Sequence, residues 1–102
     1  MINIEKIIQA IEIVKSITNS QDIYLFGSYA NGTANEQSDV DIAIIKDDVS
    51  KEYQESTEIR KAILSQGYFP LDLVFINKQN YEQRKKSFGT LQYEISENGV
   101  KF

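Results

Sequence analysis

The sequence Ile23-Tyr24-Leu25-Phe26-Gly27-Ser28 is a run of strand-forming residues that ends at a glycine and a serine. A run that is apolar on both faces is typical of a buried strand, and Gly27-Ser28 marks the point where the chain turns. A second strand is predicted at Ser38-Asp39-Val40-Asp41-Ile42-Ala43-Ile44-Ile45, with two acids at its beginning. Residues 29–35 between these strands are small and polar, enough for one or two helical turns and a loop.

Helical patterns flank this pair of strands. Apolar residues recur at three- and four-residue spacing before the first strand, which predicts an amphipathic helix from Asn3 to Thr18. A second helix is expected after the second strand, ending at about Gln66 with Gly67 as its stop signal. Its candidate N-caps are Asp47, Asp48 and Ser50.

A third strand is predicted at Pro70–Ile76, with the proline at its first position, where a missing amide donor is tolerated. Helices are expected at Asn77–Lys86 and Thr90–Asn98, separated by Phe88-Gly89, and Gly99 is expected to cap the last helix. This order of elements predicts an α/β (α+β) fold with a small three-stranded sheet covered by helices. We expect one domain over residues 1–102.

The composition excludes several kinds of chemistry. The chain contains no histidine and no cysteine, which excludes disulfides, thiolate nucleophiles, zinc-thiolate sites and histidine bases. The formal net charge of -4 disfavours broad binding to nucleic acid or to an anionic membrane. No apolar run approaches the length of a membrane span, and we expect a cytoplasmic protein. The remaining chemistry must use carboxylates, hydroxyls, amines, backbone amides or a hard metal such as Mg²⁺.

Three acids are candidate metal ligands. Asp39 and Asp41 are two residues apart in the predicted second strand, so they share a face with backbone positions roughly 6.5 to 7 Å apart. Asp72 interrupts an otherwise apolar third strand, where a charge without a partner or a cation would be costly. The alternatives are that the first two acids are solvated or cap a turn, and that Asp72 lies at an exposed strand edge.

Gly27-Ser28 is a candidate phosphate-binding turn. It follows a buried strand where the chain turns into a short helix, and such a turn offers free backbone amides and a hydroxyl to an anion. The alternative is an ordinary turn, because Gly-Ser is common after a strand.

Gly27-Ser28, then ten residues, then Asp39-x-Asp41, and later the acid of Leu71-Asp72-Leu73 together form a specific compound motif. With this motif the chain resembles the nucleotidyltransferase superfamily typified by DNA polymerase beta. Over essentially its full length it resembles the minimal nucleotidyltransferase antitoxins of toxin-antitoxin systems. One residue departs from the family pattern, because Asn31 occupies a position where the family often has arginine.

The resemblance implies a mixed three-stranded sheet that places the motif residues around a nucleotide. Asp39, Asp41 and Asp72 would be the catalytic, metal-binding acids for Mg²⁺, with two ions expected. The residues expected to bind the nucleotide, ATP, are Gly27, Ser28 and Ser38.

The resemblance also implies a function, the transfer of AMP from ATP to a hydroxyl of a cognate HEPN-type ribonuclease toxin, with tyrosine as the expected acceptor. Only 30 residues follow Asp72, too few for an acceptor-binding domain, so we expect the partner to complete the site in a hetero-oligomer. Two alternatives stay open: an antitoxin that acts by stoichiometric binding alone, and a nucleotidyltransferase acting on small molecules.

Overall fold

The computed structural model describes residues 1–102 and contains a four-stranded sheet. In chain order its strands are β1 (Asp22–Phe26), β2 (Val40–Lys46), β3 (Leu71–Asn77) and β4 (Val100–Lys101). Their order across the sheet is β3-β2-β1-β4. β2 pairs parallel with β3 and antiparallel with β1, and β4 is antiparallel to β1. The sheet is therefore mixed, as predicted.

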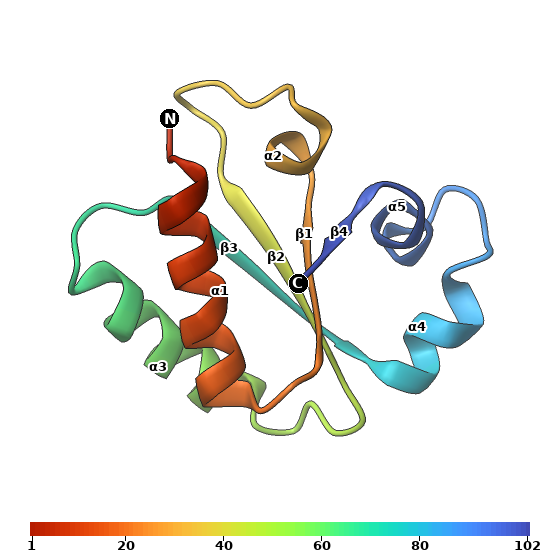
Figure 1. Cartoon of the computed structure of the whole chain (residues 1–102). Coiled ribbons are helices and arrows are strands. Elements are labelled where there is room, and N and C mark those ends of the chain that lie inside the picture. The colour runs from red at the N-terminus through yellow and green to blue at the C-terminus, as the bar shows by residue number, and fades with distance from the viewer.

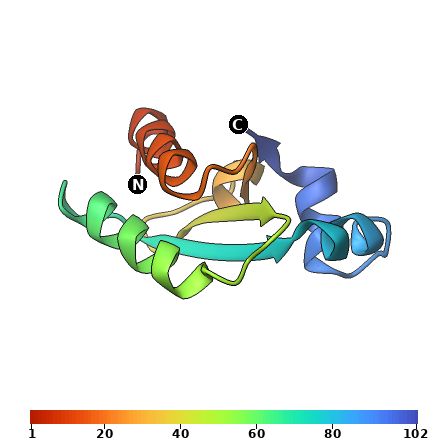
Figure 2. The same cartoon turned by 90° about the horizontal axis from the view of Figure 1, so that it is seen from below.

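Five helices surround the sheet, namely α1 (Ile4–Thr18), α2 (Ser28–Asn31), α3 (Glu52–Leu64), α4 (Lys78–Arg84) and α5 (Leu91–Asn98). Figure 1 shows α1 and α3 on one side of the sheet and α4 and α5 on the other, with α2 directly after β1. Seen from below, α1 and α3 lie side by side, away from the α4–α5 pair (Figure 2). No helix combines the length and apolar character needed to cross a membrane.

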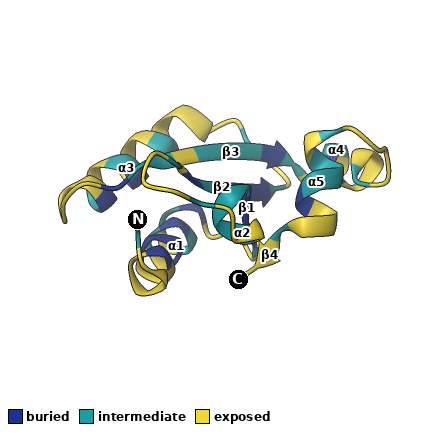
Figure 3. Ribbon diagram, turned by 90° about the horizontal axis from the view of Figure 1, so that it is seen from above, coloured by how far each residue is buried: buried dark blue, intermediate teal, exposed yellow.

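The strands divide their side chains between two hydrophobic clusters, because successive residues of a strand point to opposite faces. One face packs against α1 and α3, and its buried strand residues are Ile23, Leu25, Val40, Ile42 and Ile44. The other face packs against Tyr81 of α4 and Ile95 of α5, and its buried strand residues are Phe26, Ala43, Ile45 and Ile76. Figure 3 shows that the outward surfaces of the helices are largely exposed while the central strands are buried.

The prediction of three strands was wrong by one. Residues 100–101 form β4, in which Lys101 opposes Tyr24 and Val100 opposes Leu25, and the Phe102 amide donates to the Ile23 carbonyl at 2.9 Å. A strand of two exposed residues has no alternating pattern that a sequence could reveal. Its consequence is that the outer edge of β1 is partly covered.

The first helix is confirmed, and Asn3 caps it by accepting a hydrogen bond from the Lys6 amide at 2.9 Å. The predicted N-caps of α3 were wrong, because the helix begins at Glu52 and its N-cap, Lys51, makes no side-chain cap. The carboxylate of Asp48 instead accepts from the Ser50 amide at 2.9 Å, which forms a turn before the helix.

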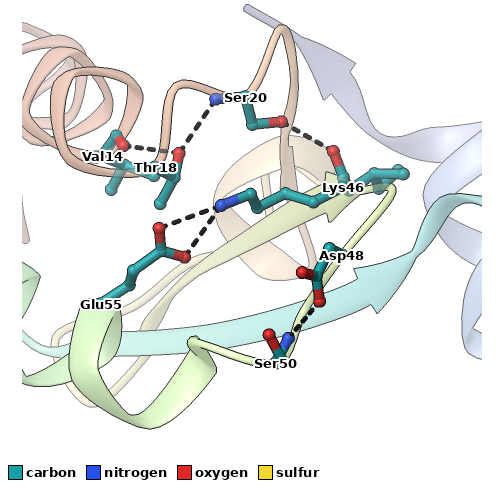
Figure 4. A network of polar contacts seen from close by, with 8 residues as sticks. Val14, Thr18, Ser20, Lys46, Asp48, Ser50 and Glu55 are labelled. Atoms are coloured by element: carbon teal, nitrogen blue, oxygen red, sulfur yellow. Dashed lines mark hydrogen bonds and ion pairs between the residues drawn. The ribbon is translucent and has the colours of Figure 1, made fainter.

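A polar network fixes α1 and α3 to the end of β2, as Figure 4 shows. The ammonium of Lys46 donates to both carboxylate oxygens of Glu55 at 3.0 and 3.1 Å, and both side chains are largely buried. The Ser20 hydroxyl donates to the Ile45 carbonyl at 2.7 Å. This network lies at the end of β2 that is opposite to Asp41, so it positions the crossover helix α3 without contacting the acids.

Candidate active site

Asp41 occupies the central position among the candidate residues. It lies near the beginning of β2, where its backbone is in register with Phe26 of β1 and with Asp72 of β3. Since β1 ends where β2 and β3 begin, Gly27, Asp41 and Asp72 meet at one end of the sheet, beside α2. The structure therefore brings together three of the residues that the sequence singled out.

The pKa of the Asp41 carboxyl group lies well above its ordinary value. Its burial raises its pKa, and the neighbouring carboxylates of Asp72 and Asp39, with a side-chain hydrogen bond to Asp72, raise it further, to about 6. A carboxyl that shares its surroundings with like charges is most stable when it holds a proton or faces a cation. Near neutral pH this group is therefore poised between its two protonation states.

Asp39 and Asp72 are both exposed, and each differs from the expectation in one respect. β2 begins at Val40 and not at Ser38, so Asp39 lies in the loop just before the strand. β3 is the outermost strand of the sheet, so the argument that a charge at Asp72 would be buried was wrong. The alternative of an exposed strand edge describes the surroundings of Asp72 correctly, and the strand register places Asp72 directly opposite Asp41.

Gly27 packs directly against the carboxylate of Asp41. Its φ of +75° lies in a region that side chains with a Cβ rarely adopt, and a Cβ built there would collide with the Asp41 carboxylate. Gly27 immediately precedes α2, and the first amides of a helix have no acceptor within it. A close backbone approach beside free amides fits the predicted phosphate-binding turn.

The two predicted serines lie in different settings. Ser28 is half-buried and is the first residue of α2, next to Gly27. The hydroxyl of Ser38 accepts from the Asn35 amide at 2.9 Å, and the Ser38 amide donates to the Asn35 carbonyl at 3.1 Å. Ser38 thus closes the turn that leads into β2, and its contact with a nucleotide stays a prediction.

The donor set at this end of the sheet fits a hard divalent cation. Carboxylate oxygens are ligands that Mg²⁺ prefers, and the carboxylates of Asp72 and Asp39 add to the effect of burial in raising the pKa of Asp41. No three acids converge closely enough in this structure to enclose a metal ion by themselves. Asp41 lies opposite Asp72 in the register of the two strands, and Asp39 lies in the exposed loop just before β2.

The acids lie on an open surface. Asp41 and Asp72 share a face of the sheet with Ala43 and Ile45. Along β2 the cluster formed with α4 and α5 begins only at Ala43, and on β1 it extends to Phe26, beside Asp41. None of the four main surface cavities is lined by Asp39, Asp41 or Asp72. A molecule as large as another protein could therefore reach the carboxylates.

One relevant residue was missed as a site residue by the sequence analysis. Arg60 of α3 donates through Nη1 to the carbonyl of Leu71 at 3.1 Å, next to Asp72. A basic residue late in a helix is explained well enough by the helix dipole, so nothing in the sequence pointed to this contact.

The raised pKa of Asp41 predicts a pH-dependent stability. The folded state holds a proton at Asp41 up to about pH 6, whereas the unfolded chain releases it near the ordinary value of 3.8. Without divalent cations, the free energy of unfolding should therefore rise by on the order of 1 kcal/mol as the pH is lowered from about 7 to about 5, after allowance for solvent screening. Urea unfolding at both pH values measures this change, and Asp41→Asn should remove it. An Asp41→Asn variant whose free energy of unfolding keeps the full pH dependence would contradict the assignment of this effect to Asp41.

The chain is similar to known proteins over nearly its whole length. Residues 7–99 match the family model described as nucleotidyltransferase domain. No curated protein matches the sequence. Among solved structures, the chain is similar to a crystal structure of a toxin-antitoxin with AMP-PNP, at 27% sequence identity and a TM-score of 0.64. The alignment covers 98% of this chain and 72% of that chain.

Two crystal structures of MntA-HpeT toxin-antitoxin mutants are also similar. The mutant with two Asp-to-Glu substitutions has 25% identity and a TM-score of 0.63, covering 98% of this chain and 72% of that one. The mutant with a Tyr-to-Ala substitution has 26% identity and a TM-score of 0.62, covering 100% and 72%. The likeness therefore spans both the sheet and the helices around it.

Proposed function

This chain belongs to the nucleotidyltransferase domain family, and we propose that it is an antitoxin that transfers AMP from ATP to a hydroxyl group of a toxin protein. The observation that carries the proposal is the pairing of Asp41 with Asp72 across β2 and β3, with Gly27 packed against the same carboxylate. Nucleotidyl transfer needs close positioning of the phosphates and neutralisation of their charge, and this end of the sheet offers residues for both tasks.

The choice of nucleotide and partner draws on the solved structures. One similar structure contains AMP-PNP, an ATP analogue, and the similar structures are those of toxin-antitoxin proteins. We assign the same class of substrate and partner to this chain. A HEPN-type ribonuclease is the toxin that we propose, and a tyrosine is the proposed acceptor.

Each motif residue has a task in the proposed reaction. Asp39, Asp41 and Asp72 would hold Mg²⁺, with two ions proposed, which would neutralise phosphate charge and lower the pKa of the attacking hydroxyl when bound. Gly27 lets its backbone lie directly against the Asp41 carboxylate, and the free amides at the beginning of α2, with the Ser28 hydroxyl, would donate hydrogen bonds to the triphosphate.

The covalent change is a displacement at the α-phosphorus of ATP. The acceptor oxygen forms a bond to that phosphorus while the bond to the pyrophosphate breaks. The exposed carboxylate of Asp72 accepts the proton of the hydroxyl, so the reaction requires no histidine. Asp72 lies on the edge strand, so the acceptor approaches from the open side of β3.

The partner supplies the acceptor because the acids lie on an open face. The described cavities do not include them, and the formal net charge of -4 favours approach by a basic protein such as a ribonuclease. Free RNA, which is itself an anion, is disfavoured for the same reason.

Labelled ATP tests the proposal. The chain is incubated with Mg²⁺, the HEPN-type toxin proposed as its partner, and ATP labelled at either the α- or the γ-phosphate. We expect label on the toxin from α-labelled ATP alone, because the γ-phosphate leaves with the pyrophosphate. Label from γ-labelled ATP would indicate phosphorylation and contradict the proposal. Full neutralisation of the toxin without any label would favour an antitoxin that acts by binding alone.

A further inference from the structure

Arg60 stands out among the charged residues of the molecule. Its side chain is half-buried on α3, and it takes part in none of the four ion pairs that the structure contains. Its guanidinium instead donates to the backbone carbonyl of Leu71, the first residue of β3, at 3.1 Å. A hydrogen bond from a half-buried guanidinium to a backbone carbonyl restrains the backbone at that point.

The beginning of β3 is held by a neighbouring strand on one side only. β3 is an edge strand, so only β2 pairs with it, and six of its seven residues are half-buried or exposed. The residue before it is Pro70, which has no amide to donate, although its carbonyl accepts from the Val40 amide at 2.6 Å. No strand pairs with the side of β3 that faces away from β2. At Leu71 the hydrogen bond from Arg60 supports the strand instead.

The contact between Arg60 and Leu71 lies next to the proposed catalytic acids. Leu71 immediately precedes Asp72, and the register of β3 on β2 places Asp72 beside Asp41. α3 is itself fixed to the far end of β2 through Glu55 and Lys46, so it gives Arg60 a rigid support. A shift of the first residues of β3 would move the Asp72 carboxylate away from Asp41, while Gly27 and Ser28 would keep their places at the end of β1.

We propose that Arg60 is a positioning residue for Asp72: by holding the Leu71 carbonyl, it keeps the beginning of the edge strand in register with β2. The inference rests on the proposed function, because it assigns Arg60 to the geometry of the transfer step. Arg60 acts through the backbone and does not touch the nucleotide.

Two variants and one matched control test this role. Arg60→Gln removes the charged donor, Arg60→Lys keeps a charged donor on a different stem, and Lys61→Gln changes the next, exposed residue of α3. The first measurement is amide hydrogen exchange in β3 and β2. A hydrogen bond from a charged donor corresponds to about tenfold or more in an opening equilibrium. We therefore expect exchange of those amides within residues 71–74 that donate to β2 to be faster by about tenfold in Arg60→Gln, intermediate in Arg60→Lys and unchanged in Lys61→Gln.

The second measurement is steady-state AMP transfer. We expect kcat to fall by about tenfold in Arg60→Gln while KM for ATP changes by less than about twofold, with partial recovery in Arg60→Lys. Unchanged exchange in β3 would overturn the proposal, and so would faster exchange with an unchanged kcat. If the wild-type chain transfers no AMP, the proposed function fails, and the exchange data alone decide whether Arg60 holds β3.

Discussion

Asp41→Asn is expected to abolish AMP transfer and to make the protein more stable in the absence of divalent cations. The substitution removes a proposed metal ligand, which corresponds to a loss of at least about 1,000-fold in activity. It also removes a partly buried charge that the carboxylates of Asp72 and Asp39 repel, while it keeps nearly the same volume. A gain of on the order of 1 kcal/mol raises the Tm of a chain of this size by about 4 to 8 °C.

Asp39→Asn is the matched control for this experiment. Asp39 is exposed in the loop before β2 and is the weaker of the two charges that repel Asp41, so its replacement should remove activity with a smaller rise in Tm than Asp41→Asn. Thermal melts with and without Mg²⁺ and ATP measure the stability of both variants. An assay of labelled AMP measures their transfer activity. Wild-type activity in Asp41→Asn would remove Asp41 from the mechanism, and a lower Tm would contradict the charge repulsion.

Gly27→Val is expected to be the most damaging change in the phosphate-binding turn. The backbone at Gly27 has a φ of +75°, where a β-branched residue is strained by about 1 to 3 kcal/mol. Its Cβ would also collide with the Asp41 carboxylate. We therefore expect a lower Tm and a loss of transfer of about 100-fold or more, because the side chain displaces the central acid.

Ser28→Ala provides the comparison at the neighbouring position. It removes one neutral hydrogen bond, worth about 0.5 to 1.5 kcal/mol, so KM for ATP should rise by about tenfold at most. Steady-state kinetics and thermal melts of both variants test this order. A Gly27→Val variant with normal kinetics and normal Tm would contradict the close approach of Gly27 to Asp41.

The sequence predicted the central part of the fold because its signals there are strong. α1 has a long apolar period and an asparagine cap, and β1 and β2 are apolar runs that end or begin at polar motifs. The pairing of Asp41 with Asp72 follows from the parallel register of two strands, which the family motif anticipated.

The errors have physical causes as well. The apolar sequence of β3 is compatible with either a central or an edge strand, and only the strand order shows that Asp72 is exposed. β4 forms because the chain after Gly99 returns to the edge of β1, a tertiary contact that leaves no local pattern. The contact between Arg60 and the Leu71 carbonyl joins a helix to a strand edge, which no sequence period encodes.

The most direct test of the account is the intact mass of the toxin after incubation with this chain, Mg²⁺ and ATP. We predict a gain of about 329 Da for each AMP added, and no gain when the chain carries Asp41→Asn. An unchanged toxin mass together with full neutralisation by the wild-type chain would contradict AMP transfer and favour inhibition by binding alone.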